Sequence, residues 1–228
     1  MEFAAINKLT LLDYPDKTAC VLYVEGCNFR CPFCHNGLTL VMGVEEEIPF
    51  EDILAFLKKR IGILDGVVIS GGEPTLMKDL KEKIKAIKEL GYDVKLDTNG
   101  TNPDIMLDLI NEGLIDYVAM DIKNSMDEYD VTTGSKVNKE NILRSIEILK
   151  SRVVDYEFRT TLIKEFHDLD EIRKMADLLD GADRLYLQQF KVSDGVINKN
   201  LHPVDEGLAN RFVEILKETI LEVELRGY

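Results

Sequence analysis

The chain has 228 residues, enough for one domain with a substantial core, and its 45% hydrophobic and 31% charged residues are ordinary for a soluble globular protein. A formal net charge of −14 argues against nucleic acid as the main partner, because binding to a phosphate backbone needs a basic surface. The sequence contains no run of about 18 apolar residues and no signal peptide. We therefore expect a cytoplasmic protein that does not enter a membrane.

Residues 1–17 are predicted to form a short hairpin or an extended lead-in, and β-branched runs then alternate with longer stretches of helical period. The predicted strands are 18–25, 66–70, 92–97, 115–122, 154–163 and 183–190. Strands that alternate with helices form parallel sheets through right-handed crossovers. A closed barrel has eight such units and this chain has six, so we predict the α/β class and a partial, open (β/α)6 barrel.

The longest predicted helix carries an apolar stripe from Leu208 through Leu216 to Val223. Two helix starts have capping signals: Asn102 precedes a first-turn proline, and Asp168 lies three residues before Glu171. We expect one domain over residues 1–228, with the six units in 18–190 and a C-terminal loop and helix in 191–228.

Three cysteines with the spacing C-x₃-C-x₂-C follow the first predicted strand: Cys27, Cys31 and Cys34. In a cytosolic protein such clustering indicates metal binding rather than disulfides. Three thiolates can hold one iron–sulfur cluster but leave a four-iron cluster one ligand short, so one iron is open to a small molecule. No cysteine follows Cys34, so the chain can hold one cluster. Cys20, in an apolar run, is expected to be a buried small side chain.

A zinc site of Cys27, Cys31, Cys34 and His35 is the alternative metal site. It requires two adjacent residues to bind one ion, and it leaves the motifs at the other strand ends unexplained. We therefore favour the cluster, and expect His35 itself to pack or hydrogen-bond locally in its loop.

Polar clusters follow the other five predicted strands. Ligands of parallel α/β folds bind at the carboxyl ends of the strands, so these clusters should meet the cysteines at one rim. They are Ser70-Gly71-Gly72-Glu73, Asp97-Thr98-Asn99-Gly100, Asp121-Ile122-Lys123, Arg159-Thr160-Thr161 and Gln188-Gln189-Phe190-Lys191.

The cysteine loop together with the Gly-Gly-Glu strand end resembles the motifs of radical S-adenosylmethionine (SAM) enzymes. Over its whole length the chain resembles the glycyl-radical-enzyme activating proteins of that superfamily, above all the single-cluster activators of anaerobic ribonucleotide reductase. The resemblance is carried by Leu11-Leu12-Asp13-Tyr14-Pro15, by Glu25-Gly26-Cys27 through Asn36, by Gly71-Gly72-Glu73, by Leu96 to Gly100, and by Asp121-x-Lys123.

SAM is then the ligand expected at the open iron, through its amino and carboxylate groups. Gly71 and Gly72 lack a Cβ, so their backbone can approach the SAM amino group closely, next to Glu73. The alternative for this segment is a plain turn between a strand and a helix. Lys123, after Ile122, can place a cation near the SAM carboxylate.

The resemblance implies further contacts with SAM and with an ion. Asp97, Thr98 and Asp121 would help to hold a monovalent cation against the SAM carboxylate, although Asp97 and Asp121 could instead cap loops or pair with Lys123. The backbone of Phe33, Cys34 and His35 would face the adenine. Arg159 resembles a SAM-contacting position and could equally form an ordinary ion pair. Lys191 occupies the position at which the family often has a histidine.

The function implied by the resemblance is reductive cleavage of SAM at one [4Fe–4S] cluster, which installs a glycyl radical on a partner enzyme. That partner would be an anaerobic ribonucleotide reductase or a formate-lyase-type enzyme, and a ferredoxin or flavodoxin would supply low-potential electrons. One alternative is a radical SAM enzyme acting on a small molecule, like 7-carboxy-7-deazaguanine synthase. A second alternative, of another class, is a non-catalytic iron–sulfur electron carrier or redox sensor.

Overall fold

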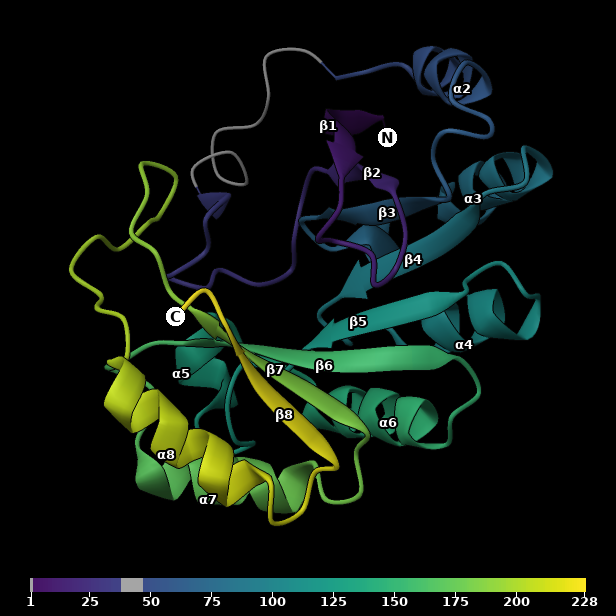
Figure 1. Cartoon of the computed structure of the whole chain (residues 1–228). Helices are drawn as coiled ribbons and strands as arrows, with labels where there is room; N and C mark the ends of the chain where they lie inside the picture. Colours follow the sequence, from purple (N-terminus) through teal and green to yellow (C-terminus); the bar gives the residue numbers. More distant parts are fainter. Residues whose placement is uncertain (1, 38–46) are drawn as a thin grey trace.

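A computed structural model describes residues 2–37 and 47–228, in which one curved sheet carries helices along its outer side (Figure 1). The eight strands lie side by side in chain order. β1 pairs antiparallel with β2, and every other neighbouring pair is parallel. The strands are β1 (Phe3–Thr10), β2 (Ala19–Val24), β3 (Gly66–Gly71), β4 (Asp93–Thr98), β5 (Tyr117–Asp121), β6 (Asp155–Leu162), β7 (Arg184–Gln189) and β8 (Glu222–Arg226).

The helices of the described residues connect these strands, and β1 and β8 form the two edges of the sheet. The fold is therefore an open, partial barrel, as predicted. The helices are α2 (Phe50–Lys58), the 3₁₀ turn η1 (Pro74–Leu76), α3 (Leu80–Glu89), α4 (Pro103–Asn111), α5 (Tyr129–Thr133), α6 (Lys139–Lys150), α7 (Leu169–Leu178) and α8 (Glu206–Leu216). None of these helices is both long and apolar enough to cross a membrane.

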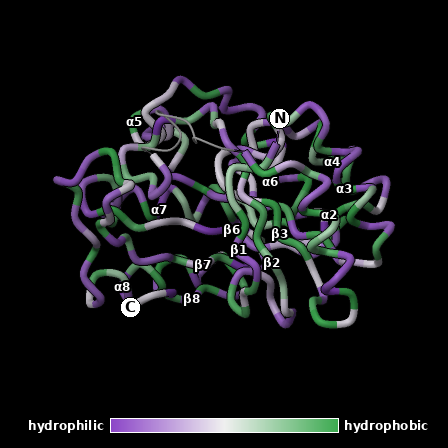
Figure 2. The backbone as a smooth tube through the Cα atoms, turned by 90° about the horizontal axis from the view of Figure 1, so that it is seen from above, coloured by the Kyte–Doolittle hydropathy of each residue, from purple (hydrophilic) through white to green (hydrophobic). Residues whose placement is uncertain are grey.

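Alternation along β4 and β6 separates an apolar outer face from a polar inner one, because successive side chains of a strand point to opposite sides. In β4, Val94 and Leu96 join the core under the helices, whereas Lys95 and Asp97 line cavities on the inner side. β6 repeats the pattern with Phe158 in the core and Arg159 inside. Figure 2 shows hydrophobic stretches along β2 and β3, in which most residues are buried.

The predicted strands correspond to β2–β7, and the predicted lead-in forms β1, which is joined to β2 as a hairpin. The prediction of one long C-terminal helix was wrong in its second half. α8 ends at Leu216, and the chain then turns and pairs Leu185 of β7 with Val223 of β8. The sequence EVELR alternates with a period of two, which is the pattern of a strand rather than of a helix.

Of the two predicted helix caps, one is confirmed. The Asp168 carboxylate accepts hydrogen bonds from the backbone N–H groups of Asp170 and Glu171, both at 2.9 Å. α4 does begin at Pro103, but the Asn102 side chain does not cap it. The Asn102 amide instead donates to Thr75 Oγ1 at 2.8 Å, so it joins two strand-end loops.

Candidate active site

The carboxyl ends of the parallel strands surround a cavity of about 270 Å³. Its walls come from the cysteine loop after β2 and from the ends of β3 to β7, as expected for a parallel sheet. The structure therefore brings most of the predicted site residues together. Those lining the cavity are Cys27, Cys31, Phe33, Cys34, His35, Gly71, Gly72, Asp97, Thr98, Asp121, Lys123 and Arg159.

The cysteine loop is a series of tight turns anchored to distant parts of the chain. Within the loop, the Cys34 N–H donates to the Cys31 carbonyl at 3.1 Å. Outside it, the Arg30 N–H donates to the Thr133 carbonyl at 2.9 Å, and the Pro32 carbonyl accepts from the Asn198 N–H at 2.9 Å. These contacts direct three free thiols into one cavity.

The thiols fit a polynuclear cluster, in which each thiolate binds a different iron atom. Burial raises the pKa of Cys31 to about 12, and it also raises the pKa of Cys27, whereas the nearby Lys123 cation favours both thiolates. Among the described residues, no three His, Cys, Asp or Glu side chains surround one point as the ligands of a single ion do. Cys20 lies fully buried in β2, as predicted.

The glycine pair at the end of β3 is held against the end of β2. Gly71 has φ of +111°, and a Cβ there would lie 2.5 Å from the Val24 carbonyl oxygen. The same carbonyl accepts a hydrogen bond from the Gly72 N–H at 2.9 Å. Because neither glycine has a side chain, their backbone forms part of the cavity wall.

Glu73 does not line the cavity: it is 1% exposed and lies beneath the glycine pair. Its carboxylate accepts hydrogen bonds from the Thr75 N–H and hydroxyl, from Thr98 Oγ1 at 2.8 Å and from the Asn99 N–H at 2.6 Å. Burial raises the pKa of Glu73 despite these donors. Its contacts join the strand-end loops of β3 and β4, so Glu73 stabilises the cavity wall without lining the cavity itself.

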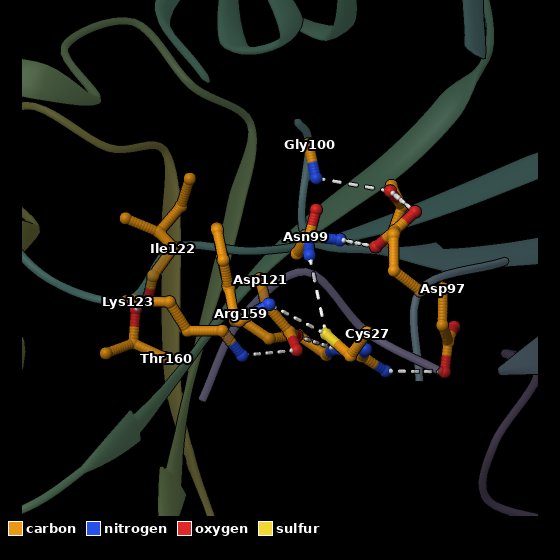
Figure 3. Close-up of polar contacts among 12 residues, drawn as sticks. Cys27, Asp97, Asn99, Gly100, Asp121, Ile122, Lys123, Arg159 and Thr160 are labelled. Atoms are coloured by element: carbon orange, nitrogen blue, oxygen red, sulfur yellow. Dashed lines mark hydrogen bonds and ion pairs between the residues drawn. The ribbon is translucent and has the colours of Figure 1, made fainter. Parts of the chain in front are cut away.

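Charged residues on the inner face form a connected cluster beside the cysteines (Figure 3). Arg159 reaches Asp121 through Nε at 3.0 Å and Asp97 through Nη1 at 3.2 Å. Lys123 pairs with Asp121 at 2.9 Å, and Lys95 pairs with Asp97 at 2.6 Å. The cluster balances two carboxylates with three cations, so it leaves a net positive charge next to the cavity.

This balance keeps the carboxylates charged. Burial alone would raise the pKa of Asp121, but Arg159 and Lys123 hold it well below its usual range. Arg159 and Lys95 likewise outweigh burial at Asp97 and lower its pKa. Arg159 thus makes the ion pairs that the sequence left open.

Phe33 and His35 form the cavity wall farther along the cysteine loop. The Phe33 ring centroid lies 6.0 Å from the Lys123 ammonium. His35 Nδ1 lies 3.4 Å from Ser193 Oγ, and the imidazole packs 5.9 Å from the Phe190 ring. His35 thus packs and hydrogen-bonds as the sequence predicts, but its partners lie in the segment after β7 rather than in its own loop, and burial lowers its pKa.

Two other predicted site residues lie outside the cavity lining. Ile122 is fully buried, and its N–H donates to the Arg159 carbonyl at 2.8 Å, so it holds β5 to β6. Lys191 is exposed, and its side-chain end lies near Gly227 at the end of the chain.

The sequence analysis placed Ser70, Asn99, Thr161 and Gln188 in the polar clusters at the rim without giving any of them a role, and all four line the cavity. Ser70 donates to Asp97 at 2.9 Å and so extends the charged cluster. Their place at the strand ends was the signal that found them, but it does not show which side chain each of them contacts.

The fold and the site together define an enzyme in which three cysteines and a glycine-rich strand end meet at the top of an open parallel barrel. The chain belongs to the radical SAM superfamily, whose family description matches residues 21–179. A [4Fe–4S] cluster and SAM are the cofactors that this membership implies.

The chain is similar to activating enzymes within this superfamily. It is 38% identical over 199 residues to a protein of Methanocaldococcus jannaschii provisionally named a glycyl-radical enzyme activating enzyme, covering 84% of this chain and 80% of that one. It is 30% identical to the pyruvate formate-lyase-activating enzyme of Clostridium pasteurianum, covering 77% of this chain and 74% of that one. The SAM-bound structure of SuiB from Streptococcus suis shares the fold, with a TM-score of 0.68 at 16% identity over 91% of this chain and 52% of that one.

Proposed function

We propose that this protein activates a partner enzyme by installing a glycyl radical, using SAM and one [4Fe–4S] cluster. The observation that carries the proposal is the meeting of three free thiols, a glycine backbone and a positively charged cluster at one cavity. The names of the two similar activating enzymes support the partner class. We propose an anaerobic ribonucleotide reductase or a formate-lyase-type enzyme as the partner.

Each group at the cavity has a role in this proposal. Cys27, Cys31 and Cys34 would hold the cluster, and the backbone of Gly71 and Gly72 would accept hydrogen bonds from the SAM amino group. When bound, the cluster supplies the single electron that splits SAM into methionine and a 5′-deoxyadenosyl radical, which takes a hydrogen atom from the substrate. The protein's task is to orient SAM and to keep water away from it.

The charged cluster would bind the SAM carboxylate. Among the described residues, Lys123 pairs with one carboxylate, that of Asp121, and Asp121 also pairs with Arg159. Lys123 can therefore turn toward an incoming carboxylate while Arg159 keeps Asp121 neutralised. We therefore propose that Arg159 holds Asp121 in place beside the SAM site. If Asp121 moved together with Lys123, Arg159 would be released and could contact SAM directly.

We also propose that a monovalent cation binds near Asp97 and Asp121. In the structure Lys95 and Arg159 already neutralise these carboxylates. A cation would have to share their oxygens with both side chains. Titration of KCl against NaCl and choline chloride tests this: a saturable, potassium-dependent rise in SAM affinity is expected, and equal affinity in all three salts would contradict it.

Anaerobic reconstitution with iron and sulfide tests the reaction. The reconstituted protein, reduced by dithionite, should convert SAM into 5′-deoxyadenosine and methionine. Failure to form 5′-deoxyadenosine from a fully loaded cluster would sink the radical-enzyme proposal. An iron–sulfur carrier or sensor would in addition show no change in the EPR spectrum of its reduced cluster when SAM is added.

Co-incubation with candidate partners tests the substrate class. With SAM and a reduced ferredoxin or flavodoxin, the proposed electron donors, the partner should acquire a glycyl-radical doublet in its EPR spectrum. Deuterium at the partner glycine should appear in 5′-deoxyadenosine. If no partner gives the doublet and a deuterated small molecule transfers its deuterium to 5′-deoxyadenosine instead, the small-molecule alternative is correct. The cytoplasmic location remains a prediction from the sequence.

A further inference from the structure

One polar side chain outside the cysteine loop points at a proposed cluster ligand. Asn99, in the loop after β4, is 5% exposed and lines the cavity. Its side-chain Nδ2 donates to Cys27 Sγ at 3.8 Å, and Figure 3 shows this contact. The Phe29 N–H donates to the same sulfur at 3.3 Å. Cys27 thus receives one donor from its own loop and one from a different strand end.

The orientation of the Asn99 amide is fixed by its other contacts. Its Oδ1 accepts a hydrogen bond from the Thr101 N–H at 3.1 Å, and a backbone N–H can only donate. The oxygen must therefore face Thr101, and the NH₂ group must face Cys27. A flipped amide would place its NH₂ group against the Thr101 N–H and lose the contact with sulfur.

Three side chains close a ring of hydrogen bonds around this amide. Asn99 Nδ2 donates to Asn28 Oδ1 at 2.8 Å, Asn28 Nδ2 donates to Thr101 Oγ1 at 2.9 Å, and Thr101 Oγ1 donates to Asn99 Oδ1 at 2.7 Å. Each side chain in the ring donates once and accepts once. The ring fastens Asn28, the neighbour of Cys27, to the end of β4.

The backbone of Asn99 extends this connection to the glycine pair. Its N–H donates to the Glu73 carboxylate at 2.6 Å, and the Glu73 N–H donates to the Gly26 carbonyl at 2.8 Å. The loops after β2, β3 and β4 are therefore joined at Asn99. A displacement of this residue would move Cys27 relative to the Gly71-Gly72 wall.

We infer that Asn99 is a positioning residue for the iron–sulfur cluster. Its amide donates a hydrogen bond to the Cys27 sulfur and thereby raises the reduction potential of the cluster. Hydrogen bonds to the sulfurs of a cluster stabilise the electron density of its reduced form. The inference rests on the proposed function only in assuming that Cys27 is a cluster ligand. It needs no SAM and no partner.

The test measures the midpoint potential by EPR during a redox titration of the reconstituted full chain without SAM. Asn99→Leu keeps a similar side-chain volume without a donor or a charge, and Asn99→Ala removes the amide altogether. At the wild-type midpoint, both variants should show about a tenfold lower ratio of reduced to oxidised cluster, equivalent to about 59 mV for a one-electron couple. Asn210→Ala, on the exposed side of α8, is the matched control and should match the wild type.

Thr101 supplies a second, milder pair of variants. Thr101→Val opens the ring without changing the side-chain shape, and should lower the potential by a smaller amount. Thr101→Ser keeps the hydroxyl and should restore the wild-type value. If the Asn99 variants fail to load iron, this pair decides the question, because equal potentials for Val and Ser would overturn the inference.

The outcomes separate this inference from the proposed function. If the Asn99 variants carry a full cluster at the wild-type potential, the amide is only structural, even when the wild type cleaves SAM. If the wild type holds a cluster but does not cleave SAM, the potentials still decide the role of Asn99 while the proposed function fails.

Discussion

Arg159 of β6 and Asp121 of β5 are register partners in the sheet, and Arg159 Nε lies 3.0 Å from Asp121 Oδ1. Directly opposed side chains on one face of a sheet are close neighbours, so this pairing follows from strand register. Arg159 also reaches Asp97, two strands away, at 3.2 Å. One guanidinium thus holds two partly buried carboxylates at the rim of the active-site cavity.

Replacing Arg159 by methionine should destabilise the protein by about 1–3 kcal/mol, because Asp121 and Asp97 each lose one charged hydrogen-bond donor and keep only Lys123 and Lys95. Urea denaturation of the cluster-free chain measures the change. Arg152→Met is the matched control, since its ion pair with Asp183 lies at the surface and should add little. Equal losses for the two variants would show that the Arg159 cluster has no special energetic role.

Stability should fall at acid pH because of Asp97 and Asp121. Both have a lower pKa in the folded chain than the ordinary value near 4. The unfolded chain therefore binds more protons as the pH falls, so stabilisation present above about pH 4 is lost below it, by at most about 1.4 kcal/mol per pH unit for each group.

Urea denaturation between pH 3 and 7 checks this prediction, and Asp121→Asn should give a shallower loss than the wild type. Glu73 acts in the opposite sense, because its raised pKa makes stability fall as the pH rises through its titration. Glu73 is present in both the wild type and Asp121→Asn, so the difference between their pH profiles of stability reports Asp121 alone. Parallel profiles would contradict the lowered pKa of Asp121.

Gly71→Ala should damage the site more than Gly91→Ala. Both glycines have positive φ, +111° and +87°, which costs a residue with a Cβ about 1–2 kcal/mol. Only at Gly71 would the new Cβ also meet backbone, 2.5 Å from the Val24 carbonyl oxygen, whereas nothing lies within 4 Å at Gly91. Thermal unfolding and SAM binding by calorimetry measure the two effects, and similar values for both variants would argue against a close-packed Gly71.

Replacing Cys27, Cys31 or Cys34 by alanine should in each case abolish a stable [4Fe–4S] cluster. The three thiolates bind three of its four irons, and loss of any one leaves two irons without a protein ligand. Iron and sulfide content and visible absorbance report the loss. Cys20→Ala is the control: it should keep the full cluster and lose only stability, because Cys20 is buried in β2. Cluster loss in Cys20→Ala at unchanged folding would assign that residue a ligand role.

The strands from β2 to β7 could be read from the sequence because each is a short apolar run bounded by turns and separated from the next by a helical stripe. The prediction missed β8 because it assigned Val223 to the helical stripe of α8, although the alternation of Glu222–Arg226 is typical of a strand and Val223 pairs with Leu185. Lys191 was predicted as a site residue because it occupies the family's histidine position after the sixth strand. Its side chain lies outside the cavity because the path of the loop after β7 decides where it points, and the sequence does not give that path.

The sequence by itself determined the chemistry of this protein: the spacing of Cys27, Cys31 and Cys34, with Gly71-Gly72-Glu73 at the next strand end, is local and needs no long-range contact to be recognised. Only the tertiary structure decided the surroundings of these groups. Arg159 meets Asp97 through strand register, and Asn99 meets Cys27, 72 residues earlier, because two strand-end loops lie side by side. Such contacts depend on how distant segments pack, so no spacing in the chain encodes them on its own.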